Sequence, residues 1–194
     1  MGKFVISVLG FDRPGIIALI AKVLFEKDCN IENVSQTILQ SEFSGAFIVW
    51  APETLLRDDL ENALIEKLSP LDMHVFVKKI TTMIPNDDAA KRWCDDCKSK
   101  KIEPFVVTTI GPDRKGLVAS ITEVIARHHA NVTNLHAVFK GGDDPNRNFM
   151  IYEVDVPMGQ ETQVFFDDLR KKARELELDI SIQHKNIFKE INRI

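Results

Sequence analysis

The chain carries one segment twice: FVISVLGFDRPGIIALIAKVLFEKDCNIENV begins at Phe4, and FVVTTIGPDRKGLVASITEVIARHHANVTNL begins at Phe105. The two align without a gap at a constant shift of 101 residues. Polar and glycine residues recur in loop-like places, which indicates that both copies present the same polar loop. The matched pairs are Gly10 and Gly111, Asp12 and Asp113, Arg13 and Arg114, Gly15 and Gly116, Asn30 and Asn131, and Asn33 and Asn134.

Each copy opens with a strand, a tight turn and an amphipathic helix. In the first copy, Phe4–Leu9 is rich in β-branched and apolar residues, which predicts a buried strand. Asp12 is predicted to cap the following helix, with Pro14 just inside it. The apolar residues that recur at helical spacing are Ile16, Ile17, Ile20, Val23 and Leu24, and in the second copy Leu117, Val118, Ile121, Val124 and Ile125.

The rest of each copy predicts two more strands, a second helix and a last strand. In the first copy these are strands 31–39 and 46–51 joined by the turn SEFSG, helix 55–68 and strand 73–80. The second copy predicts strands 105–110, 132–139, 149–156 and 178–187, with helices 114–129 and 164–176. The order βαββαβ is the split βαβ arrangement of ferredoxin-like folds. The predicted class is therefore α+β, with antiparallel sheets and helices on one face.

A charged segment separates the copies. Residues 81–103 hold Pro85 and many acidic and basic residues, a composition typical of a linker. The predicted domains are therefore 1–80 and 104–194, with 81–103 between them. The second copy differs from the first in its longer hairpin loop, GGDDPNRN at 141–148.

The composition limits which binding partners and which cellular compartment are expected for this protein. A formal net charge of −4 argues against a broad nucleic-acid face, which needs clustered Lys and Arg. The sequence has no apolar run of about 18 residues, so no spanning helix and no membrane partner are expected. The N-terminus lacks the pattern of a secretory signal, and three cysteines fit reduced thiols in the cytoplasm.

A strand, then D-R-P-G, then an apolar helix and an Asn-Ile at the next strand together resemble the ACT domain family. The doubled form is similar to tandem ACT proteins related to the glycine cleavage system transcriptional repressor. The resemblance implies a regulatory module that binds an amino acid between paired units. It implies ligand contacts at Gly10, Asp12, Gly15 and Asn30, and at Gly111, Asp113, Gly116 and Asn131. The other repeated polar residues, Arg13, Asn33, Arg114 and Asn134, complete the predicted ligand-binding set.

The chemistry of these residues is independently compatible with that site. A helix N-terminus attracts a carboxylate, a glycine allows close approach, and Asp and Asn can bond an ammonium or a zwitterion. A competing interpretation gives Asp12, Gly15 and Asn30 only a cap, a packing role and a turn. The sequence also departs from the family, because some members carry His where Gly10 and Gly111 stand. Lys115 replaces the usual Pro and either attracts an anionic ligand or points to solvent.

The segment Trp93–Cys97 contains C-x-x-C, which is compatible with exposed thiols, a metal site or a redox pair. No catalytic residue, metal site or cofactor is predicted from the remaining motifs, and the repeats leave little chain for a catalytic domain. We expect a non-catalytic regulator that transmits amino-acid binding to a protein partner or to a homo-oligomer such as a dimer. The alternative is a ligand-independent adaptor that acts through protein contacts.

Overall fold

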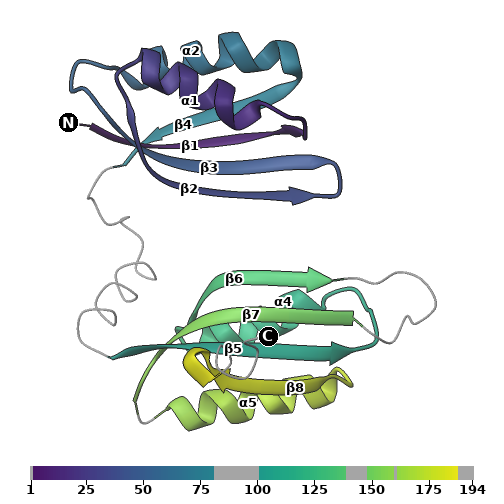
Figure 1. Ribbon diagram of the computed structural model, residues 1–194. Coiled ribbons are helices and arrows are strands. Elements are labelled where there is room, and N and C mark those ends of the chain that lie inside the picture. Colours follow the sequence, from purple (N-terminus) through teal and green to yellow (C-terminus); the bar gives the residue numbers. More distant parts are fainter. Residues whose placement is uncertain (1, 81–100, 139–147, 160, 188–194) are drawn as a thin grey trace. The chain divides into compact units, whose positions relative to one another are not determined.

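The structure is a computed structural model that describes residues 2–80, 101–138, 148–159 and 161–187. The chain divides into two compact units, one within residues 1–83 and the other within 84–194. Each unit is a four-stranded antiparallel sheet, and Figure 1 shows that both helices of a unit lie on the same face of its sheet. The predicted α+β class, with two ferredoxin-like units in tandem, is confirmed.

The first unit has the sheet order β2-β3-β1-β4, so β2 and β4 are the edge strands. Its elements are β1 (Gly2–Phe11), α1 (Ile16–Glu26), β2 (Asn30–Leu39), β3 (Glu42–Ala51), α2 (Arg57–Leu68), the short 3-10 helix η1 (Ser69–Leu71) and β4 (Met73–Lys79).

The second unit repeats this order as β6-β7-β5-β8. Its elements are β5 (Ile102–Gly111), α4 (Leu117–Arg127), β6 (Asn131–Val138), β7 (Asn148–Pro157), α5 (Thr162–Glu175) and β8 (Asp179–His184).

Alternate strand residues face the helices and form a separate core in each unit. Phe4, Ile6 and Val8 of β1 are buried in this way in the first unit, and Tyr152 and Val154 of β7 are buried in the second. Four of the five predicted apolar positions of α1 are buried: Ile16, Ile20, Val23 and Leu24. The fifth, Ile17, is 39% exposed. In α4 the buried positions are Leu117, Ile121, Val124 and Ile125.

The first hairpin turn is tighter than the predicted turn SEFSG. Strand β2 extends to Leu39 and β3 starts at Glu42, because Gln40 adopts a left-handed conformation (φ 58°) that reverses the chain. Gly45 therefore lies inside β3, where a Cβ would come within 2.7 Å of the Phe43 ring. Glycine at position 45 therefore makes room for the neighbouring Phe43 ring, and it is not needed for the turn.

Candidate functional site

The two D-R-x-G loops lead into α1 and α4 through glycines in the left-handed conformation. Gly15 (φ 96°) and Gly116 (φ 89°) are the N-cap residues, so the helices begin at Ile16 and Leu117. The prediction that Asp12 caps the helix is wrong, and Pro14 lies before the helix. The chain turns at Gly15, three residues after Asp12, because glycine adopts a positive φ at little cost.

This local geometry leaves both helix starts without a side-chain cap. No side chain forms a capping hydrogen bond at the N-terminus of α1 or of α4. The first N–H groups of an α-helix have no partner inside the helix, and they carry partial positive charge. The carboxylate of Asp12 is likewise not used as a cap. Each loop therefore presents donors and a carboxylate close together.

A cavity adjoins each loop. In the first unit it measures about 640 Å³ and is lined by the loop Asp12–Gly15, the first turns of α1, and Gln36, Ile38 and Phe43 of the hairpin. In the second unit it measures about 680 Å³ and is lined by residues 113–119. Lys115 is exposed at this second cavity. The structure thus places Asp12, Gly15, Asp113 and Gly116 beside space that a small ligand could occupy.

The two loop arginines differ in their surroundings. Arg114 donates a hydrogen bond to the carbonyl of Leu176, and its guanidinium lies 3.9 Å from the Glu177 carboxylate. It therefore holds the loop against the connection between α5 and β8. The Arg13 guanidinium lies 6.0 Å from the centre of the Phe11 ring, and its buried Nε has no hydrogen-bond partner among the described residues. Arg13 is accordingly the better placed of the two to bind a ligand.

The predicted asparagines lie at the other end of each sheet from the loops. Asn30 of β2 pairs with Trp50 of β3, and Trp50 in turn pairs with Lys3 of β1. Gly10 of β1 pairs instead with Phe43, at the opposite end of β3. Gly10 lies seven positions after Lys3 along β1, a distance of about 23 Å. Asn131 and Asn134 repeat this placement, because Asn131 aligns with Asp155 and Pro104. Within one unit, therefore, the predicted ligand-binding residues do not form a single site.

The remaining loop glycines have a structural role in strand packing. A Cβ on Gly10 would lie 2.8 Å from the carbonyl oxygen of Asp72. A Cβ on Gly111 would lie 2.6 Å from Cδ2 of Leu178. Both glycines are buried and let the last strand of the unit approach the start of the loop.

The edge formed by α1 and β2 exposes apolar side chains. Strand β2 is an edge strand whose residues are almost all exposed. Three apolar side chains stand out on it, namely Val34 (42% exposed), Ile38 (50%) and Leu39 (67%). On α1, Phe25 is 82% exposed. Unpaired edge strands and exposed apolar patches are surfaces on which other chains pack.

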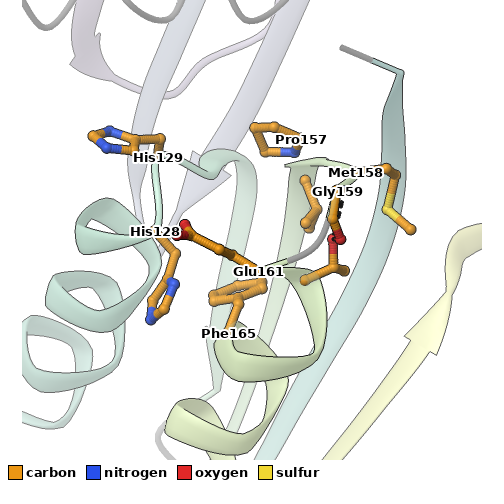
Figure 2. Close-up of a pocket in the computed structure, with 9 residues that line it drawn as sticks. His128, His129, Pro157, Met158, Gly159, Glu161 and Phe165 are labelled. Atoms are coloured by element: carbon orange, nitrogen blue, oxygen red, sulfur yellow. Dashed lines mark hydrogen bonds between the residues drawn. The ribbon is translucent and has the colours of Figure 1, made fainter.

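A third cavity, of about 350 Å³, lies in the second unit where α4 ends and α5 begins, and Figure 2 shows its lining residues. Two of its polar side chains, those of His128 and Thr162, already have hydrogen-bond partners. His128 Nε2 lies 2.9 Å from Oδ2 of Asp168, and the Thr162 hydroxyl bonds the backbone of Gly159. The described residues contain no group of three or more His, Cys, Asp or Glu side chains suited to a metal ion. The D-R-x-G loops, with an uncapped helix start beside a cavity in each unit, remain the stronger candidate site.

The cysteines add no site within the described residues. Cys29 is half-buried, and burial raises the pKa of its thiol, which makes the thiolate scarcer at neutral pH. Cys94 and Cys97, which form the C-x-x-C motif, lie outside the described residues.

Each unit has the order βαββαβ, and its D-R-x-G loop ends in a left-handed glycine beside a cavity. This arrangement is that of a regulatory ligand-binding domain. The chain belongs to the ACT domain family, whose model matches residues 3–78 and 103–183. The expected family membership and tandem duplication are thereby confirmed. The family and the repressor described next indicate a regulatory ligand-binding protein. In the part of the chain that the structure describes, no helix has the length and apolar character needed to cross a membrane.

Similar proteins match either one unit or most of the chain. A UPF0237 protein of Methanopyrus kandleri is 32% identical over 90 residues, which are 46% of this chain and 96% of that protein. The glycine cleavage system transcriptional repressor of Escherichia coli is 28% identical over 134 residues, or 68% of this chain and 62% of that protein. A solved structure from Galdieria sulphuraria covers 94% of this chain and 98% of its own with a TM-score of 0.72. Its 20% identity shows the common fold alone.

Proposed function

We propose that this protein is a non-catalytic regulator that binds an amino acid at its D-R-x-G loops and transmits binding to its oligomeric state or to a protein partner. The observation that carries the proposal is the uncapped helix start beside a cavity in each unit. An α-carboxylate fits such a helix start, and the nearby Asp12 or Asp113 carboxylate suits the ammonium group. The likeness to the Escherichia coli repressor supports a regulatory output in transcription.

Pairing of units would complete the site. If the α1–β2 edges of two units met in antiparallel fashion, the start of β2 in one unit would face the loop of the other. Asn30 would then approach the loop that lies about 23 Å away within its own unit. The exposed Val34, Ile38 and Phe25 supply an apolar contact for this pairing. A ligand that bridges the two units would stabilise the pair, with a typical coupling of about 1–3 kcal/mol.

Amino-acid binding is tested by calorimetric titration of the full chain with each of the twenty amino acids at millimolar concentration. We expect at least one to give saturable heat and to raise the melting temperature. Replacing both loop carboxylates, Asp12→Ala with Asp113→Ala, is expected to weaken that binding about 10- to 100-fold, because each provides a charge-assisted hydrogen bond.

The matched control removes a carboxylate away from the loops. Asp59 is exposed on α2, the helix that packs on β4 at the other edge of the sheet, so Asp59→Ala should bind the ligand as tightly as the natural chain. No heat and no change in melting temperature with any of the twenty would contradict the ligand proposal. That outcome would favour the adaptor alternative, in which a partner complex forms equally well with and without amino acids.

A further inference from the structure

Two buried polar side chains lie without a complete set of partners beneath the loop of the second unit. Among the described residues, the Thr109 hydroxyl oxygen and Oδ1 of Asn148 have no hydrogen-bond partner, although these side chains are 0% and 2% exposed. Gly111, two residues after Thr109 on the same face of β5, pairs with Asn148 on β7. The two side chains are therefore diagonal neighbours on the face that the helices cover. Buried polar groups in native proteins are nearly always satisfied, so this pair calls for a missing partner.

The first unit has no such pair at the equivalent positions. Val8 stands where the second unit has Thr109, and Phe43 pairs with Gly10 as Asn148 pairs with Gly111. Val8 and Phe43 are buried in the hydrophobic core, and Phe43 also lines the first cavity together with Ile38. The equivalent positions are thus apolar in the first unit and polar in the second, where residues 113–119 line the cavity and Asn148 meets it through Asp113.

The polar pair is connected to the candidate site of the second unit. Nδ2 of Asn148 donates a hydrogen bond of 3.4 Å to Oδ1 of Asp113, and Asp113 lines the cavity there. The remaining amide oxygen of Asn148 can only accept a hydrogen bond, whereas the Thr109 hydroxyl can donate or accept. A group that satisfies both must itself carry a donor, such as a hydroxyl or an amide.

We propose that Asn148 and Thr109 form a buried subsite that takes the hydrogen-bonding side chain of an amino acid in the second unit. The proposal rests on the proposed function, since it assigns the side-chain end of the same ligand. The second unit then selects an amino acid with a hydroxyl or amide side chain. The first unit, walled by Phe43 and Ile38, does not make that selection. Ordered water could satisfy the same two atoms, and the experiment below distinguishes water from ligand.

The test compares threonine with valine, which have nearly the same shape and differ in one hydroxyl. Calorimetric titration of the full chain is expected to show threonine binding at least about tenfold more tightly than valine at one site, because a site built for a hydroxyl rejects the analogue without it. Thr109→Val, Asn148→Leu and Asn148→Phe are expected to abolish this preference. Asp59→Ala, which removes an exposed carboxylate on α2 away from both loops, should retain it.

Thr109→Val separates binding from folding. Removing a buried hydroxyl without a partner should raise the melting temperature of the free protein, while threonine binding falls by about tenfold or more. A purely structural role would move both quantities in the same direction. Circular dichroism shows whether the two Asn148 variants keep the fold.

The possible failures are distinct. If threonine and valine bind the natural chain equally, or if the preference survives in Thr109→Val and Asn148→Leu, the two atoms hold water only and the subsite is overturned. The proposed function would stand in that case. If no amino acid binds the natural chain at all, the subsite and the proposed function fail together.

Discussion

Gly10→Ala is expected to lower the free energy of unfolding of the first unit by about 3 kcal/mol, the upper end for overpacking a well-filled site. An added Cβ would lie 2.8 Å from the carbonyl oxygen of Asp72 and 3.1 Å from Cα of Met73. Both obstructing atoms belong to the backbone of the turn into β4, so rotation of a side chain cannot relieve the contact. Urea unfolding followed by circular dichroism measures the loss.

Two other glycines provide controls for this prediction. Gly111→Ala should cost less, about 1–2 kcal/mol, because its closest obstacle is the side-chain atom Cδ2 of Leu178 at 2.6 Å and its nearest backbone obstacle, the Glu177 carbonyl oxygen, is farther away at 3.0 Å. At Gly15 nothing lies within 4 Å of an added Cβ, so Gly15→Ala should cost about 1 kcal/mol through its positive φ alone. The packing interpretation of Gly10 is wrong if Gly10→Ala proves no more destabilising than Gly15→Ala.

The fold could be predicted because the spacing of apolar residues along the sequence specifies its strands and helices. Strand alternation and helical periodicity recur in both copies, and the buried positions of α1 and α4 are the ones that the spacing marks. The start of α1 was misplaced because Asp is a preferred cap residue and sequence alone does not show the conformation of a glycine. Only the left-handed φ of Gly15 shows that the helix begins after it.

The candidate site could be predicted in part. The loop residues Asp12 and Gly15 do border a cavity, as the residue types suggested. Asn30 was grouped with them because a single helix separates the two in sequence, but strand register places it at the other end of the sheet. Asn148 was missed because the hairpin loop changes the shift between copies from 101 to 105 residues, which hides its equivalence to Phe43. Only the pairing of the strands reveals that correspondence.

Tyr152 is expected to ionise far above its usual range. Its side chain is 0% exposed on β7, and burial raises its pKa from 10.0 to about 12. Its hydroxyl contacts only a weak acceptor among the described residues, the Met150 sulfur at 3.3 Å. Because Tyr152 is the one tyrosine in the chain, tyrosinate absorbance during an alkaline titration reports on it alone.

The same pKa predicts how stability depends on pH. Below pH 10.0 Tyr152 is neutral in both the folded and the unfolded chain. The buried neutral side chain therefore makes its full contribution to the free energy of unfolding in that range. Between pH 10.0 and about 12 the unfolded chain releases the phenolic proton and the folded chain retains it. A difference of two pH units at 1.36 kcal/mol each corresponds to a loss of about 2.7 kcal/mol from the free energy of unfolding. Tyr152→Phe should remove this part of the pH dependence, and a tyrosinate midpoint near 10 in the folded protein would show that the ring is accessible to water.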